Sequence, residues 1–247
     1  MNNYNSICDD IHVNLHLNTE MDLPQSRESV LHFFEQVQKR FSSMTNFYAR
    51  ERGEFCLEED KEGGQHRWVS VEPRRLSSGW VNPTSIESAI EQHQSILELM
   101  PYALTISHLD CESLNFAMGF HYNYRGNQNE LLAEALGMVP ALERMSEFPG
   151  ASILGYEPSI QLSLDDDCRT QCRLEFETRN NAYQVRTGEF SEDQLSVYLI
   201  VRRFDSLRSE ENYAVELARL AKICTEMVDS YVVENVLIPL QQTIALK

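Results

Sequence analysis

The chain has 247 residues, of which 42% are hydrophobic and 24% charged, the proportions of an ordinary globular protein. Lys and Arg total 21 against 38 Asp and Glu, which gives a formal net charge of −17 at pH 7. A field of that sign repels nucleic-acid phosphates and anionic lipid surfaces. The charge therefore argues against nucleic-acid-binding and membrane-binding proteins, and it favours solubility or a basic partner.

The N-terminal sequence MNNYNSICDD has neither the basic region nor the apolar region of a secretory signal, and no run approaches 18 apolar residues. We therefore expect a cytoplasmic protein that does not span a membrane. Six cysteines are scattered along the chain, at positions 8, 56, 111, 168, 172 and 224. In a reducing compartment these are expected to be free thiols.

The first half of the chain predicts strands and two helices in a clear order. Residues 11–17 (IHVNLHL) alternate apolar and polar side chains, which predicts a strand with one buried face. A helix is predicted over residues 26–42, where apolar residues recur three and four positions apart. Strands follow near residues 46–51, 54–59, 66–74 and 76–82, with glycines between them. Thr84 and Glu87 form a capping-box pattern, which opens a helix that runs to about residue 100.

The second half predicts the same order of elements. A strand covers residues 114–125, and Asn127 with Glu130 resembles another helix cap. The helix that follows is disturbed at Pro140. Strands are predicted near residues 159–165, 171–179, 182–188 and 195–204. The last helix covers residues from about 210 to 238, and Pro239 must kink or end it.

Three pairs of segments match in the same order in the two halves. Residues 11–18 (IHVNLHLN) match residues 120–127 (FHYNYRGN) at an offset of 109. Residues 55–60 match 162–167 at an offset of 107, and residues 69–74 match 174–179 at an offset of 105. Alternating strand patterns alone also generate such pairs, but the steady drift is what short loop deletions produce. We predict an internal duplication, with a first repeat at 1–103 and a second at 104–247, in one compact pseudo-twofold domain.

Strands with one apolar face belong to antiparallel sheets that helices cover on one side. The predicted fold class is therefore α+β, with two copies of a β-α-β(3-4)-α unit. This order of elements resembles the TATA-box-binding-protein fold and the single-copy helix-grip fold, and the resemblance carries no functional motif. Together with stretches such as residues 179–188 (RNNAYQVRTG), the layout is also similar to an uncharacterised family of bacterial proteins. That resemblance implies a fold and a cytoplasmic location, but no activity.

The repeated His-x-Asn pattern is the main candidate for a binding site. Its residues and those of neighbouring strands are expected to share the polar face of the sheet: His12, Asn14, His16, Glu72, Arg74, His121, Asn123, Arg125, Glu177 and Arg179. In a pseudo-twofold arrangement they could converge on one polar groove, where imidazoles are available for acid–base chemistry. A solvated face with cross-strand ion pairs explains the same pattern, and so does a polar homodimer interface.

Residues of metal-ligand type occur in the short stretch from His108 to His121, but they lack the tight paired spacing of zinc sites. Cys168 and Cys172 follow three aspartates, whose charges disfavour the thiolate that a nucleophile needs. His93 falls on the apolar side of its helix and is typical of a core histidine. Glycine-rich phosphate loops, nucleophile elbows and paired zinc motifs are absent from the sequence. We therefore expect no cofactor, no metal and no catalytic residue.

The leading hypothesis is a non-catalytic intracellular protein that acts by binding another protein or a second copy of itself. The alternative is an enzyme or small-molecule binder that uses a polar groove on the sheet face. In that alternative, His12, His121, Arg74 and Arg179 contact the ligand. A pocket in which polar groups of both copies converge would favour the alternative over the leading hypothesis.

Overall fold

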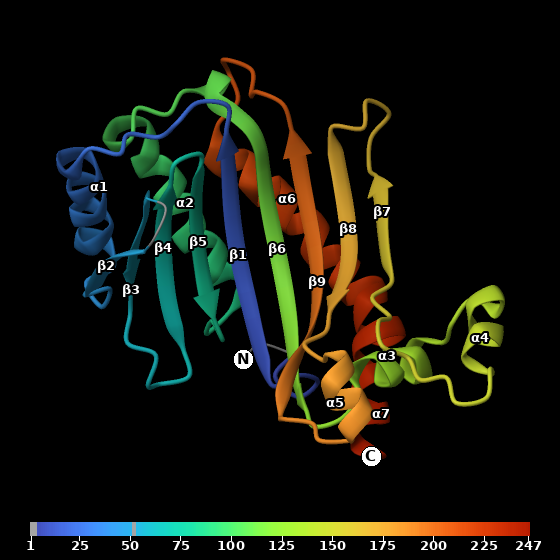
Figure 1. Ribbon diagram of the computed structural model, residues 1–247. Coiled ribbons are helices and arrows are strands. Elements are labelled where there is room, and N and C mark those ends of the chain that lie inside the picture. Colours follow the sequence, from blue (N-terminus) through green and yellow to red (C-terminus); the bar gives the residue numbers. More distant parts are fainter. Residues whose placement is uncertain (1–3, 51–52) are drawn as a thin grey trace.

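The computed structural model describes residues 4–50 and 53–247, and these form a mixed α+β fold. The strands of the described residues make one antiparallel sheet in the order β2-β3-β4-β5-β1-β6-β9-β8-β7 (Figure 1). The strands are β1 (Asp10–Thr19), β2 (Asn46–Arg50), β3 (Glu54–Glu58), β4 (His66–Glu72), β5 (Arg75–Val81), β6 (Cys111–Tyr124), β7 (Ser159–Ser163), β8 (Thr170–Glu177) and β9 (Asp193–Phe204). The predicted α+β class with an antiparallel sheet is confirmed.

The helices lie between and after these strands in the chain. They are α1 (Arg27–Arg40), α2 (Ile86–Ala103), the short 3₁₀ turn η2 (His108–Asp110), α3 (Gln128–Leu136), α4 (Pro140–Ser146), α5 (Ala182–Thr187), α6 (Tyr213–Met227), the π-helical segment η3 (Val228–Leu237) and α7 (Ile238–Ala245). The described residues contain no helix long and apolar enough to cross a membrane.

β1 and β6 pair antiparallel at the centre of the sheet. In β1 the alternation of the sequence becomes an alternation of burial, because Ile11, Val13, Leu15 and Leu17 are fully buried on one face. β5, β4 and β3 lie outward from β1, and β9, β8 and β7 lie outward from β6. The same strand order in both halves also arises in sheets of unrelated origin, so the duplication stays a prediction.

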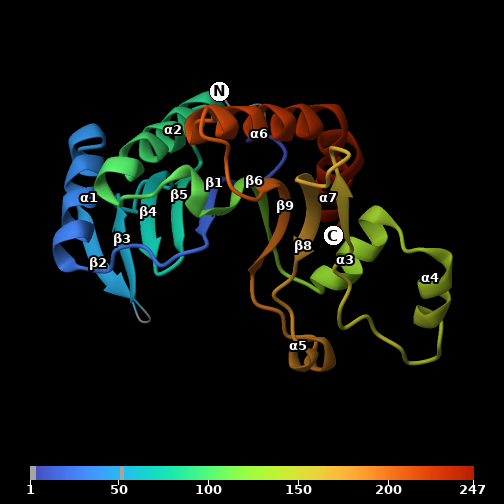
Figure 2. The ribbon, with the colours of Figure 1, turned by 90° about the horizontal axis from the view of Figure 1, so that it is seen from above.

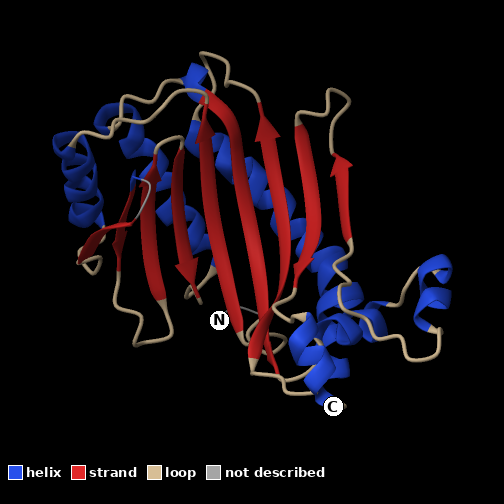
Figure 3. Ribbon diagram, in the orientation of Figure 1, coloured by secondary structure: helices blue, strands red, loops and turns tan. Residues whose placement is uncertain are grey.

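The long helices cover one face of the sheet and leave the other without a helix over its centre. α2 packs on β1 and β5, α6 packs on β6 and β9, and the two helices lie side by side (Figure 2). Figure 3 shows the opposite face of the sheet, with α2 and α6 behind the strands. We call this opposite face the open face. His93 of α2 is fully buried in the core, as its place on the apolar side of the helix predicts.

Helix ends agree with the sequence at one predicted cap and differ at another. Asn127 caps α3, because its side chain accepts hydrogen bonds from the N–H groups of Asn129 and Glu130. α2 is capped by Ser85, whose hydroxyl accepts from the Ser88 N–H, and not by Thr84 as the capping-box pattern predicts. Thr84 and Ser85 are neighbours, and both are residue types that cap helices. The sequence pattern therefore does not decide which of the two is the N-cap.

The strand predicted over residues 182–188 is wrong, because this segment forms helix α5. Asn181 and Gln184 make a reciprocal capping box at its start, and Gly188 ends it in the left-handed region at φ 71°. Glycine adopts this conformation without the clash that a Cβ brings. At the C-terminus, the predicted helix consists of three successive segments, α6, η3 and α7, and it continues past Pro239, which is the second residue of α7.

Candidate functional site

The open face carries several of the predicted site residues, and pairing of β1 with β6 brings two of them into contact. The rings of His12 and His121 have their centroids 4.0 Å apart. His121 Nδ1 forms a 2.8 Å hydrogen bond with Ser196 Oγ, and the ring packs edge-on against Tyr198 at 5.6 Å. A Cβ on Gly119 would meet the Tyr198 ring at 2.8 Å, so the absence of a side chain there makes room for this cluster.

Burial disfavours the charged form of both imidazoles of this pair. Burial, with the charges of His12 and Arg179, lowers the pKa of His121 to about 3. Burial also lowers the pKa of His12, against the opposing effect of Asp10. A general acid or base works best with a pKa near the operating pH. The pair is therefore suited to hydrogen bonding with a ligand rather than to proton transfer at neutral pH.

His121 retains one free hydrogen-bonding atom. Its side chain is 2% exposed, and Nε2 has no hydrogen-bond partner among the described residues. Glu177 lies in register beside Ser196 at this end of the open face, and Arg179 donates a hydrogen bond to Glu177. The structure thus brings together four predicted site residues, His12, His121, Glu177 and Arg179.

A second polar hollow lies on the open face over the first half of the chain. It has a volume of about 240 Å³, and His16, Glu72 and Ser77 are among its lining residues. His16 Nδ1 forms a 2.9 Å hydrogen bond with Ser77 Oγ. Burial, followed by the charges of Arg75 and Arg202, lowers the pKa of His16 to about 4. All the residues that line this hollow come from the first half, so polar groups of the two halves do not converge in it.

The other predicted site residues occupy separate places. Asn14 lies between the two clusters, and its buried Oδ1 has no partner among the described residues. Arg74 lies in the turn between β4 and β5, where it donates to the Thr19 and Glu20 carbonyls at 3.0 and 2.7 Å, so its predicted place on the open face is wrong. Asn123 is exposed near the end of β6, and Arg125 follows that strand and donates to the Phe190 carbonyl at 3.1 Å. The polar groove predicted from all ten residues is thus divided.

The cysteines and histidines do not gather into a metal site. Among the residues that the structure describes, no group of three or more His, Cys, Asp or Glu side chains could hold a metal ion. All six thiols are free, and only Cys168 is exposed. Burial raises the pKa of Cys8, Cys56 and Cys111 to about 12, which makes these thiols poor nucleophiles.

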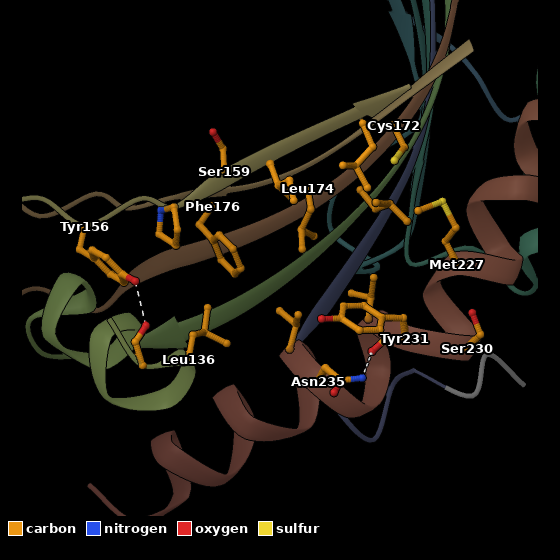
Figure 4. A pocket seen from close by; sticks show the side chains of 17 residues that line it. Leu136, Tyr156, Ser159, Cys172, Leu174, Phe176, Met227, Ser230, Tyr231 and Asn235 are labelled. Atoms are coloured by element: carbon orange, nitrogen blue, oxygen red, sulfur yellow. Dashed lines mark hydrogen bonds between the residues drawn. The ribbon is translucent and has the colours of Figure 1, made fainter. Parts of the chain in front are cut away.

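A larger hollow, which sequence reasoning missed, lies on the helical side of the sheet. We call it the apolar groove, and its volume is about 650 Å³. β7, β8 and β9 form one wall, the end of α6 and η3 form the other, and the end of α3 with residues 156–158 closes one side (Figure 4). Apolar side chains dominate its lining, and they include Leu136, Ile160, Leu162, Leu174, Phe176, Leu199, Met227, Val232 and Val236.

The groove exists because none of the helices in the described part of the chain covers β7 and β8. In the first half, α1 packs against the outermost strand, where the Phe34 ring lies 5.6 Å from the Phe47 ring of β2. In the second half, the helix after β6 is α3, which packs against α7 at the end of the sheet. Ile160 and Leu162 therefore remain 54% and 46% exposed, although they point to the same side of the sheet as the core.

A few polar groups stand among the apolar residues of the groove. The Tyr156 hydroxyl donates to the Gly137 carbonyl at 2.8 Å, and the Asn235 amide donates to the Tyr231 carbonyl at 2.9 Å (Figure 4). Both donors bond to carbonyl groups of the protein itself, so neither hydrogen bond selects a particular ligand. The Tyr231 ring is 59% exposed and faces the groove. Such a lining suits an apolar ligand with little demand for hydrogen bonds.

The charges around the groove are mostly negative. Glu157 precedes β7, and the exposed residues 165–167, all aspartates, follow it at the other end. Glu234 is exposed on η3. The cations recorded nearby have acidic partners, because Arg219 pairs with Glu216 and Lys247 pairs with Glu134. The groove is thus an apolar hollow with an acidic rim.

Comparison with known proteins gives no assignment. No family model and no curated protein matches this chain. Among solved structures, an alkyldihydroxyacetonephosphate synthase is similar over 96% of this chain and 44% of its own, with 9% sequence identity and a TM-score of 0.18. This chain therefore spans less than half the length of that protein, and a likeness of this size carries no argument about fold or function. The resemblance to an uncharacterised bacterial family stays a prediction.

Proposed function

We propose that this chain is a non-catalytic binding protein that receives an apolar segment of a partner protein in the apolar groove. The observation that carries the proposal is the exposure of Ile160 and Leu162 on the wall of a 650 Å³ apolar hollow. Exposed apolar surface of this kind marks interaction sites in folded proteins. The acidic rim and the net charge of −17 favour a partner whose apolar segment is flanked by basic residues.

The histidine pair on the open face also favours a binding protein over an enzyme. Burial lowers the pKa of His12, and the pKa of His121, at about 3, lies too low for acid–base work at neutral pH. The buried thiols lack the thiolate character of nucleophiles. Binding rather than catalysis is therefore the function that these side chains favour.

The groove is tested with Nile red, an uncharged dye that fluoresces in apolar sites, and with the variant Leu162→Asp. The matched control is Leu109→Asp, because Leu109 is also exposed, at 67%, and does not line the groove. Losing the cover of the exposed half of Leu162 weakens binding by about 1 kcal/mol, or roughly fivefold, and the desolvation of the aspartate carboxylate weakens it further. We expect that loss for Leu162→Asp and an unchanged dye affinity for Leu109→Asp. Equal binding by both variants would refute the groove as the site.

A second candidate function is the binding of a small polar molecule at the histidine pair. It is favoured by the buried His121 Nε2, which has no hydrogen-bond partner among the described residues. A ligand that fills this position would stabilise the folded state, because a ligand that binds only that state raises the unfolding temperature. A thermal-shift screen of small polar metabolites against the natural chain and His121→Phe tests this function. Compounds that stabilise both proteins equally would exclude the pair as the site.

A further inference from the structure

β7 is a sheet edge that lacks the usual protection. Only β8 pairs with it among the described residues, all five of its residues are exposed, and none is charged. Natural edge strands are blocked by charges, prolines, bulges or a covering helix. At the opposite edge, β2 ends in Arg50, which pairs with Glu54 at 3.1 Å, and Phe34 of α1 contacts the Phe47 ring of β2. β7 has neither a charged side chain nor a covering helix.

The register with β8 identifies the free backbone groups of β7. The Leu164 N–H donates to the Thr170 carbonyl at 2.8 Å, so residue 164 is in a hydrogen-bonded pair with β8. Such pairs alternate with non-hydrogen-bonded pairs in antiparallel strands. Ile160 and Leu162 therefore also direct their N–H and C=O groups to β8. The N–H and C=O groups of Ser159, Gln161 and Ser163 point away from the sheet, where a further strand would lie.

We infer that the partner segment binds as an extended strand along β7, with basic residues beyond the paired region. The inference rests on the proposed function, because it describes how an apolar segment reaches the groove. Side chains of an added strand alternate between the two faces of the sheet. Those on the groove side lie next to Ile160 and Leu162 and cover their exposed surface, while its backbone bonds to the free groups of β7.

The charges at the ends of β7 select a basic segment over a second copy of this chain. Two copies that pair antiparallel along the whole of β7 place Gln161 opposite itself. That register brings Glu157, two residues before β7, close to Asp165 of the other copy, two residues after it, and like charges this close oppose pairing. A segment with Lys or Arg at both ends instead meets Glu157 at one end and residues 165–167 at the other. A basic partner therefore fits this edge better than self-association.

The inference is tested with a fluorescein-labelled peptide that alternates valine and threonine between terminal lysines. Gln161→Pro removes one outward N–H and leaves the bonds to β8, while Gln161→Ala is the matched control that keeps this N–H. We expect the natural chain and Gln161→Ala to bind the peptide alike. Binding by Gln161→Pro should be weaker by about tenfold or more, from one lost hydrogen bond and the obstruction by the proline ring.

Amide hydrogen exchange of the natural chain provides a readout that no substitution can disturb. On addition of the peptide, the amides of Ser159, Gln161 and Ser163 should exchange at least about tenfold more slowly, since they gain hydrogen bonds. Those of Ile160 and Leu162 are already bonded and should change little. Strand addition at β7 would be overturned if the outward and the β8-bonded amides slowed alike, or if neither group slowed although the peptide binds.

Two further peptides separate the inference from the function on which it rests. One is a lysine-rich amphipathic helix of equal charge, and the other is the alternating peptide with glutamates in place of lysines. If the helix binds more tightly than the strand and Leu162→Asp abolishes its binding, the proposed function stands and strand addition fails. If no peptide binds and Nile red binds Leu162→Asp normally, both fail. Dimerisation of the natural chain that Gln161→Pro abolishes would show that a second copy occupies the edge, against the basic partner.

Discussion

His93 should make this protein lose stability as the pH falls below about 6.5. The imidazole is fully buried in α2, with Nε2 3.2 Å from the Val13 carbonyl and Nδ1 3.0 Å from Ser78 Oγ. A carbonyl only accepts hydrogen bonds, so Nε2 carries the proton and Nδ1 accepts from the Ser78 hydroxyl. The Gln92 amide donates to the same hydroxyl at 3.0 Å. This network joins α2 to β1 and β5. A second proton, on Nδ1 of His93, would break the hydrogen bond that Nδ1 accepts from Ser78.

The size of the effect follows from the two pKa values. Burial lowers the pKa of His93 to about 3, whereas an unfolded chain has a histidine pKa of about 6.5. Between these values the unfolded state binds a proton that the folded state does not, so stability falls as the pH falls. The loss is about 1.4 kcal/mol per pH unit, or about 2 kcal/mol at pH 5. Above pH 6.5 both states are neutral at this residue, and the contribution disappears.

The measurement compares the natural chain with His93→Leu by urea denaturation at pH 7 and pH 5. Other groups titrate in both proteins, so their contributions cancel in the difference between the two pH-dependent losses. We expect the natural chain to lose about 2 kcal/mol more than the variant between these pH values. At pH 7 the variant should be less stable by about 1–3 kcal/mol, because it lacks the hydrogen bonds to Val13 and Ser78. Equal losses in both proteins would refute the buried, neutral state of His93.

Three further predictions concern the helix cap, the thiols and nucleic acid. Ser85→Ala should lower the free energy of unfolding by about 1 kcal/mol and Thr84→Ala by clearly less, since Ser85 caps α2; the reverse order in urea denaturation would contradict this cap. A thiol reagent should label one cysteine, Cys168, in the folded protein and six after unfolding; a stoichiometric zinc in elemental analysis would contradict the reading of free thiols. Duplex DNA should not bind with micromolar affinity at about 150 mM salt, because carboxylates pair with arginines such as Arg173 and Arg203; a fluorescence titration with steep salt dependence would overturn this.

The strands of the central pair could be predicted because their information is local. In β1 the period-two pattern alone fixes the element, its buried face and its buried residues. Helix α5 could also have been found, since Asn181 and Gln184 form a capping pattern and Gly188 a stop. The alternation of Tyr183 and Val185 with polar neighbours favoured a strand instead. Six residues are too few for either periodicity to decide, so the caps at the two ends define this element.

The candidate site on the open face depends on which strands are neighbours, and a single sequence does not give this information. The repeat placed His12 and His121 at equivalent positions of two strands, but equivalence does not imply contact. Contact arises because β1 and β6 pair antiparallel, with His12 opposite Gly119 and His121 opposite Asp10. Arg74 lies off the open face for a local reason. β4 ends at Glu72, so the alternation that would place Arg74 on the open face stops two residues too early.

The apolar groove could not be predicted because its cause is the position of a helix. The segment of β7 has the alternation of a strand with one buried face, and that face should be covered by the helix after β6. α3 is only nine residues long against fourteen for α1, and Gly137 ends it with a φ of 73°. It therefore packs at the end of the sheet and leaves Ile160 and Leu162 about half exposed. Covering the rest of each side chain is worth about 1 kcal/mol, half of the value for full burial of such a residue. An edge strand with this uncovered surface and no blocking charge is a hazard for an isolated chain, and a bound partner segment removes the hazard and gains the free energy of burial.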